Sequence, residues 1–237
     1  MDHRAVAAMS EQHLSCVELE PTGAANAAVI WLHGLGASGD DFVPAVPYLN
    51  LPDSAAVRFI FPHAPVRPVT VNNGWPMPAW YDILSIDIER KIDTDSLLLS
   101  VEQINALISR EIERGIAPER IVLAGFSQGG AVAYHTALCY PQPLAGLVVL
   151  STYIATGEMI QQQRQAANNK LPIWLAHGAM DDVVPFSLGE QAVLMLQQMD
   201  YEPEWHSYPI AHEVSPEELA ELGHWLIQIL ELEEVAE

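Results

Sequence analysis

A serine flanked by glycines is the first feature of the sequence that could carry out chemistry. Residues 125–129 read Gly-Phe-Ser-Gln-Gly, which matches the G-x-S-x-G pattern of a nucleophile elbow. An apolar run at 121–124 precedes the motif, and small residues at 131–138 follow it with helical character. An elbow needs this strand-turn-helix context, because its serine sits in a strained turn with almost no room for neighbouring side chains. The pattern therefore predicts Ser127 as a nucleophile at the start of a helix, where the helix dipole stabilises negative charge; the alternative is an ordinary glycine-rich turn.

A serine nucleophile needs a base, and the base needs an acid that orients it. In the α/β architecture that carries such elbows, the acid and then the histidine follow the serine along the chain. Asp181 and Asp182 lie in the loop that follows the apolar run at 171–177, at the end of a strand where open α/β sheets build their sites. The sequence leaves the choice between these two carboxylates open.

His212 is the best candidate for the base. It lies between a strand-like segment at 204–208 and the final helix, which places it in a loop. His206 is the main rival, but it lies inside the strand-like segment and would have to point along the strand to reach Ser127. No set of ligands with metal-binding spacing is apparent, so we expect no metal site.

An oxyanion that forms on the substrate needs two backbone N–H donors. One should be the N–H of Gln128, the residue after the nucleophile. The other should come from the loop after the early strand 27–33, where Leu35 is well placed to donate. Removing one such donor typically costs about 3–4 kcal/mol of transition-state stabilisation.

The same loop also matches a different motif. Residues 34–39 spell the G-x-G-x-x-G fingerprint of dinucleotide binding. That fingerprint requires a carboxylate near the end of the next strand to hold the ribose, but the next strand ends Phe-Pro-His at 61–63. An NAD-dependent oxidoreductase is therefore disfavoured.

The elements that must position these residues alternate along the chain. Apolar runs at 27–33, 56–61, 120–126, 144–150 and 171–177 predict strands that are covered on both faces, as in a parallel sheet. Apolar residues spaced by three and four from Leu97 to Ile112 predict a helix with one buried stripe. Ser215, Pro216 and Glu218 predict the capped start of the last helix. The pattern indicates one doubly wound α/β domain over residues 1–237, with a mostly parallel sheet and helices on both faces.

Residues 62–81 form the one long irregular stretch, and a loop of that length inside a compact domain is usually functional. Its apolar residues are too irregularly spaced for a helix or strand face. We expect Trp75, Met77 and Trp80 to line an acyl groove beside Ser127. The alternative is that they pack together as the core of the loop.

Composition limits the classes of partner. The chain has 31 acidic and 10 basic residues among 237, which gives a formal net charge of −21. Such a surface repels phosphate backbones and anionic lipid headgroups, so we expect neither nucleic acid binding nor tight electrostatic docking on a membrane. No apolar stretch approaches the length that spans a bilayer, so we expect no stable membrane insertion. Two cysteines form no disulfide framework, and no signal peptide or membrane span is apparent. A cytoplasmic protein is the default expectation.

Taken together, the motifs resemble the phospholipase/carboxylesterase family of α/β hydrolases, which includes the carboxylesterases and acyl-protein thioesterases. The resemblance extends from about residue 27 to the last helix. It rests on Leu-His-Gly-Leu-Gly at 32–36, Pro-His-Ala-Pro-Val-Arg-Pro-Val-Thr at 62–70, the elbow with Gly130, and His-Gly at 177–178 with Asp181 and Val-Pro at 184–185.

The resemblance implies an α/β-hydrolase fold with Ser127 as nucleophile, Asp181 as acid, His212 as base, and Leu35 and Gln128 as oxyanion donors. It implies carboxylic esters as substrates, with acyl-protein thioesters or lysophospholipids as further options, and no cofactor. One departure is Asp182, where eukaryotic relatives often have proline. Several members form homodimers, and the sequence leaves that option open. The alternative from another class is a non-catalytic binding module on a hydrolase fold.

Overall fold

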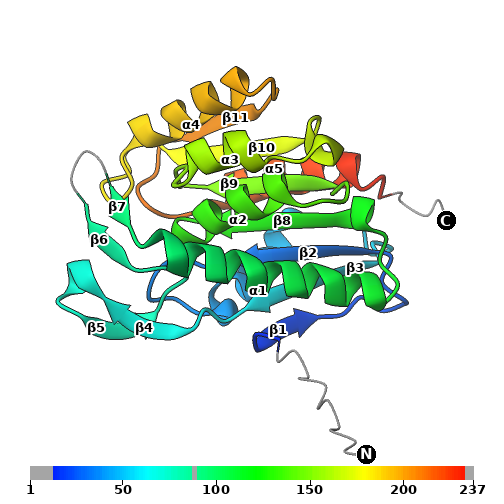
Figure 1. The fold of residues 1–237 in the computed structure, drawn as a ribbon. Helices are drawn as coiled ribbons and strands as arrows, with labels where there is room; N and C mark the ends of the chain where they lie inside the picture. The colour runs from blue at the N-terminus through cyan, green and yellow to red at the C-terminus, as the bar shows by residue number, and fades with distance from the viewer. Residues whose placement is uncertain (1–12, 87–89, 233–237) are drawn as a thin grey trace, which may run out of the picture.

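A twisted sheet forms the centre of the computed structural model, which describes residues 13–86 and 90–232. Its strands are β1 (Cys16–Leu19), β2 (Ala27–Leu32), β3 (Val57–Pro62), β8 (Ile121–Phe126), β9 (Gly146–Leu150), β10 (Ile173–Gly178) and β11 (Glu204–Tyr208). They lie in the order β1-β3-β2-β8-β9-β10-β11 (Figure 1). Only β1, at the edge, pairs antiparallel; the other neighbours are parallel. All carboxyl ends of the parallel strands therefore meet at one edge of the sheet.

The five apolar runs of the sequence each coincide with a strand of this sheet, and their ends agree to within two residues. Strand β2 shows why these runs are continuously apolar. Ala28, Ile30 and Leu32 point into the core on one face, while the alternate residues Val29 and Trp31 point into the core on the other. A strand that is covered on both faces has no polar side, and the near-continuous apolarity follows from that.

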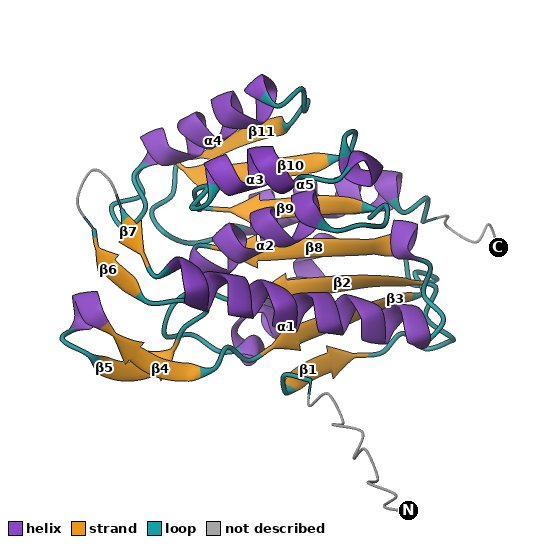
Figure 2. Ribbon diagram, in the orientation of Figure 1, coloured by secondary structure: helices purple, strands orange, loops and turns teal. Residues whose placement is uncertain are grey.

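Helices cover both faces, as the sequence predicts (Figure 2). One face carries α1 (Thr94–Glu113), α2 (Gln128–Cys139), α3 (Gly157–Gln163) and α4 (Phe186–Gln198). The other carries the 3₁₀ segment η1 (Gly39–Leu49) and α5 (Pro216–Ile229). The apolar stripe of α1 is buried from Leu97 to Ile108, and the capping box of Ser215 and Glu218 begins α5 as expected. In the described part of the chain, no helix has the length and apolar character to cross a bilayer.

The stretch 62–81 is more regular than its sequence indicates, and this corrects the expectation of an irregular loop. It contains a hairpin of β4 (Val66–Val69) and β5 (Trp75–Pro78), joined through a short 3₁₀ turn, η2 (Thr70–Asn72). Prolines argue against a central strand, but this is a separate two-stranded sheet whose strands are both edges, where proline is tolerated. A second small hairpin, β6 (Ile83–Ser85) and β7 (Lys91–Ile92), follows it.

Candidate active site

Ser127 lies in a backbone conformation that non-glycine residues rarely adopt. Its φ is 53° and its ψ is −121°, at the turn between β8 and α2. Such a conformation costs about 1–3 kcal/mol and persists only where the surroundings enforce it. The N–H of Ser127 donates to the carbonyl of Leu150 at 2.9 Å, and the Thr152 hydroxyl donates to the Ser127 carbonyl at 2.5 Å. Both contacts come from the end of the neighbouring strand β9, which holds the serine in this turn.

The glycines on either side of Ser127 are required by close backbone packing. A Cβ on Gly125 would lie 2.5 Å from the carbonyl oxygen of Gly129. A Cβ on Gly129 would lie 2.5 Å from the carbonyl oxygen of His33, in the preceding β2 loop. The motif predicts that both positions lack a side chain, and the structure shows the reason. Gly125 packs against the backbone of the elbow itself, and Gly129 packs against the segment that follows β2.

His212 bridges Ser127 and Asp181. Its Nε2 atom lies 2.9 Å from Ser127 Oγ, and its Nδ1 atom lies 2.7 Å from Asp181 Oδ2. An ionised carboxylate only accepts hydrogen bonds, so Nδ1 carries the proton and Nε2 is free to accept the proton of the serine hydroxyl. The His212 ring also contacts the ring of Phe126 at 4.7 Å between centroids, which fixes its plane.

Asp181 is buried, yet both of its oxygens have partners. Oδ1 accepts from the N–H groups of Val183 and Val184, at 2.9 and 2.8 Å. Oδ2 accepts from His212, and His177 Nε2 lies 3.4 Å away. Burial alone would raise the pKa of Asp181, but hydrogen bonds from His177, His212 and Val184 outweigh it and hold the pKa well below its usual range. These hydrogen bonds therefore favour the ionised carboxylate in the folded protein.

The loops that carry Asp181 and His212 are fastened to each other. The N–H of Ala179 donates to the carbonyl of Tyr208 at 2.8 Å, and the N–H of Met180 donates to that of Ile210 at 3.0 Å. A Cβ on Gly178 would lie 2.2 Å from the carbonyl of Ala211, so only glycine permits this approach. The loops after the neighbouring strands β10 and β11 thus hold Asp181 and His212 together.

The rival residues lie elsewhere. Asp182 is exposed, and the residue whose carboxylate contacts His212 is Asp181. The His206 ring stacks on Trp174 at 4.7 Å between centroids, and its Nδ1 lies 3.7 Å from a Glu221 oxygen. His206 therefore faces α5 and not the serine.

Two residues near Ser127 have backbone N–H groups without a hydrogen-bond partner among the described residues. Gln128 is the first residue of α2, where helical N–H groups have no partner within the helix. In the loop after β2, Gly36 donates to the carbonyl of Pro78 at 2.8 Å and Ala37 donates to that of Gly34 at 3.3 Å. Among the described residues, the N–H of Leu35 between them has no acceptor. Leu35 and Gln128 both line the same pocket as Ser127.

Hydrogen bonds of His33 and Trp80 hold the loop after β2 in place. The N–H of Ala64 donates to His33 Nε2 at 3.0 Å, so Nδ1 carries the proton and donates to the Gly34 carbonyl at 2.7 Å. Burial lowers the pKa of His33, which favours this neutral ring. The indole N–H of Trp80 donates to the His33 carbonyl at 2.8 Å. Trp80 is fully buried in this role, so it supports the site from the core and does not line it.

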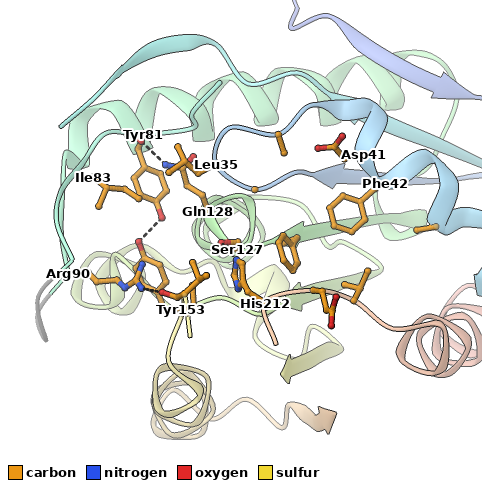
Figure 3. A pocket seen from close by; sticks show the side chains of 18 residues that line it. Leu35, Asp41, Phe42, Tyr81, Ile83, Arg90, Ser127, Gln128, Tyr153 and His212 are labelled. Carbon is orange, nitrogen blue, oxygen red and sulfur yellow. Dashed lines mark hydrogen bonds between the residues drawn. The ribbon is translucent and has the colours of Figure 1, made fainter. Parts of the chain in front are cut away.

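The pocket beside Ser127 has a volume of about 450 Å³ (Figure 3). Trp75, Met77 and Trp80 are not among its lining residues, which corrects the expectation that they form an acyl groove. Trp75 is 70% exposed on the β4–β5 hairpin, and Met77 lies beside the loop after β2, with its sulfur 3.8 Å from a Cβ built on Gly36. Trp75 and Met77 lie on the hairpin and Trp80 follows it in the core, and spacing alone could not indicate these different surroundings.

Other side chains line the pocket instead. On one side of Ser127 lie Tyr81, Ile83, Arg90 and Tyr153, and on the other lies Phe42 (Figure 3). No motif in the sequence singles these out, because they come from separate elements. The only available signal was position: Tyr81 ends the loop that we expected to be functional, and Tyr153 follows a predicted strand.

Comparison with known proteins identifies the family. Residues 15–230 match the family described as Phospholipase/Carboxylesterase. Acyl-protein thioesterase 1 of Saccharomyces cerevisiae is 38% identical over 210 residues, which cover 85% of this chain and 92% of that protein. Carboxylesterase SOBER1 of Arabidopsis thaliana is 35% identical over 201 residues, which cover 84% and 88%.

The fold agrees with this. The crystal structure of Arabidopsis thaliana SOBER1 superposes with a TM-score of 0.82 and 33% identity, over 86% of this chain and 99% of that one. The match includes the sheet and its α/β-hydrolase architecture. The chain therefore belongs to the phospholipase/carboxylesterase family, and it is a serine hydrolase of the carboxylesterase and acyl-protein thioesterase type.

Proposed function

We propose that Ser127, His212 and Asp181 form the catalytic triad of this hydrolase and that Leu35 and Gln128 donate the backbone N–H groups of its oxyanion hole. The observation that carries the proposal is the unbroken chain of contacts from Ser127 Oγ through His212 to Asp181, at 2.9 and 2.7 Å. It supports an acyl transfer in two halves, with a covalent acyl-enzyme between them.

In the first half, Ser127 Oγ attacks the carbonyl carbon of the substrate while His212 Nε2 accepts the hydroxyl proton. The carbonyl oxygen becomes an oxyanion, which the N–H groups of Leu35 and Gln128 stabilise. His212 then gives its proton to the leaving oxygen or sulfur as the bond breaks. Asp181 remains ionised throughout and stabilises the imidazolium.

In the second half, water replaces the leaving group. His212 Nε2 removes a proton from the water, whose oxygen attacks the acyl carbon of the ester on Ser127. A second oxyanion forms and collapses, the carboxylic acid leaves, and Ser127 recovers its proton from His212. The cycle needs no group beyond these five residues and water.

We propose carboxylic esters as the primary substrates, with acyl-protein thioesters as a second candidate because relatives at similar identity carry both names. The mostly apolar pocket favours an acyl group. His212 can donate its proton to a leaving oxygen or to a leaving sulfur. Turnover of an oxygen ester and a thioester with the same acyl chain separates the two, and a lysophospholipid with that chain provides the third comparison.

The roles are tested by turnover of p-nitrophenyl acetate. Ser127→Ala should lose on the order of 10⁴–10⁶ in kcat, since loss of a triad member leaves only binding and the oxyanion hole. Ser187→Ala is the matched control, because Ser187 is an exposed serine on α4 away from the pocket. Retention of more than a tenth of wild-type activity in folded Ser127→Ala would remove Ser127 from its role.

A further inference from the structure

The pocket beside Ser127 is not the only cavity at this edge of the sheet. A second cavity of about 120 Å³ lies next to it. Among the described residues, Arg90 and Tyr153 alone line both cavities. These two side chains therefore form the partition between the space next to the nucleophile and the space behind.

The partition is held by contacts on both of its members. The guanidinium carbon of Arg90 lies 5.2 Å from the centre of the Tyr153 ring, within the range of a cation–π contact. Arg90 also donates a hydrogen bond to the carbonyl of Val183, in the loop that carries Asp181. The hydroxyls of Tyr153 and Tyr81 share a hydrogen bond of 2.8 Å, and both tyrosines are buried. Figure 3 shows Arg90 and Tyr153 next to each other at one end of the pocket.

The geometry of acyl transfer decides whether the acyl chain or the leaving group of the substrate lies against Arg90 and Tyr153. The leaving group must lie near His212 Nε2, which protonates it, and His212 packs on Phe126. Phe126 and Phe42 are in contact at 5.6 Å between centroids, so the leaving group lies toward them. The arm on the other side of Ser127, which ends at Arg90 and Tyr153, is left for the acyl chain (Figure 3).

The second cavity would suit further methylene groups. Apart from the two partition residues, its lining is formed by apolar side chains and one glutamine: Ile154, Ala155, Leu188, Gln191, Ala192 and Met195. A guanidinium and a pair of hydroxyls, by contrast, are poor neighbours for the end of an alkyl chain, because covering them costs solvation that methylene groups do not replace.

We propose that Arg90 and Tyr153 are the specificity-determining residues for acyl length: they end the acyl arm and keep straight chains out of the second cavity. The substrates are then esters or thioesters of acyl groups short enough to end before the partition. This inference rests on the proposed function, because it requires the acyl carbon to be bound at Ser127.

The test is a series of straight-chain p-nitrophenyl esters from acetate to dodecanoate, with kcat/KM of each protein divided by its own value on acetate. Arg90→Ala and Tyr153→Leu each open the partition. Each added methylene that enters the second cavity should raise kcat/KM by roughly three- to fourfold over the wild-type profile, so the optimum moves to longer chains.

Two variants serve as controls. Arg164→Ala removes a matched pair elsewhere, because Arg164 lies 5.9 Å from the Tyr201 ring centre and donates to the carbonyl of Met199. Its profile should follow the wild type. Tyr153→Phe removes the hydroxyl but keeps the ring in the wall, so its optimum should also stay near the wild-type length.

A double variant tests where the longer chain goes. Ala155→Leu fills part of the second cavity, so Arg90→Ala combined with Ala155→Leu should lose the gain of Arg90→Ala on long esters. Parallel profiles for wild type, Arg90→Ala and Tyr153→Leu would overturn the inference, as would a gain that Ala155→Leu does not reduce. These outcomes are ratios within an active enzyme, whereas failure of the proposed function would appear as Ser127→Ala that still hydrolyses acetate.

Discussion

The side-chain oxygen of Gln128 accepts a hydrogen bond from the backbone N–H of Trp80 at 2.8 Å, and its amide nitrogen donates to the carbonyl of Tyr81 at 2.7 Å. Gln128, whose backbone N–H we propose for the oxyanion hole, therefore also anchors through its side chain the segment at Trp80 and Tyr81, which forms one wall of the pocket. Gln128 and Trp80 are both buried, so water cannot replace these bonds.

Replacing Gln128 with alanine should therefore destabilise the fold more than it impairs chemistry. Gln128→Ala leaves a buried N–H and a buried carbonyl without partners, at roughly 1–3 kcal/mol each. It keeps the backbone N–H, so kcat on acetate should fall far less than in Ser127→Ala. Urea unfolding measures the first effect, with Gln197→Ala on the exposed face of α4 as control. Equal stability of the two variants would contradict this reading of the anchor.

The choice between the adjacent acids gives a ranking. Asp181→Asn should lose roughly 10³-fold or more in kcat/KM, because the imidazole loses the acceptor that fixes its tautomer. Asp182→Asn should lose less than tenfold, since Asp182 is exposed. Kinetics of both variants on one short ester decide the matter, and the reverse ranking would transfer the orienting role to Asp182.

The close approach at Gly129 predicts a strong effect from one methyl group. In Gly129→Ala the Cβ would lie 2.5 Å from the carbonyl oxygen of His33 and 2.6 Å from that of Leu32. The elbow and the segment at the end of β2 would have to move apart. We expect a lower thermal midpoint and loss of most activity. Gly23→Ala is the control, because a Cβ on Gly23 has nothing within 4 Å. A Gly129→Ala variant as active and stable as Gly23→Ala would show that the approach is not tight.

Glu218 predicts a pH dependence of stability. Burial raises its pKa to about 7, the nearby Glu221 adds to this, and the N–H of Ser215 opposes it. Between about pH 4.3 and pH 7, the folded state therefore keeps a proton on Glu218. The unfolded chain has released this proton, because an ordinary glutamate has a pKa of about 4.3. The contribution of protonated Glu218 to the free energy of unfolding is full below about pH 4.3 and is lost as the pH rises toward 7.

The variant Glu218→Gln tests that linkage. A glutamine keeps an acceptor for the Ser215 N–H at the start of α5 but cannot ionise. The free energy of unfolding between pH 4.5 and 7.5 should fall less steeply in Glu218→Gln than in the wild type. Unfolding curves at several pH values measure this difference, and identical slopes would mean that Glu218 ionises freely in the folded protein.

The sequence predicts the strands and the elbow well because their signals are local. Residues 121–129 contain the strand, the glycines and the serine in one segment, and each rests on backbone sterics. His212 could be selected because it lies in a loop after a strand-like segment. Asp181 and Asp182 could not be separated by pattern, because only the turn at Val183 and Val184 decides which carboxylate faces inward.

The pocket lining could not be predicted, because its walls come from segments far apart in the chain. Trp75 and Trp80 lie five residues apart, yet one is on an exposed hairpin and the other is in the core. Their exposures differ because Trp75 lies on the β4–β5 hairpin and Trp80 lies beyond it. The sequence does not predict the hairpin, because prolines in this segment argue against strands. Arg90 and Tyr153 meet only because the β6–β7 hairpin comes to lie beside the end of β9.

The most direct test of the account is covalent labelling with a fluorophosphonate, followed by mass mapping of the peptides. The probe reacts only with a serine that a neighbouring base has activated, and its phosphonyl oxygen needs the oxyanion donors. If Ser127 is the nucleophile, the protein should carry one adduct per chain, located on Ser127, which is lost in Ser127→Ala and retained in Ser187→Ala. An unlabelled wild-type protein, or an adduct that persists in Ser127→Ala, would contradict the assignment of Ser127 as the nucleophile.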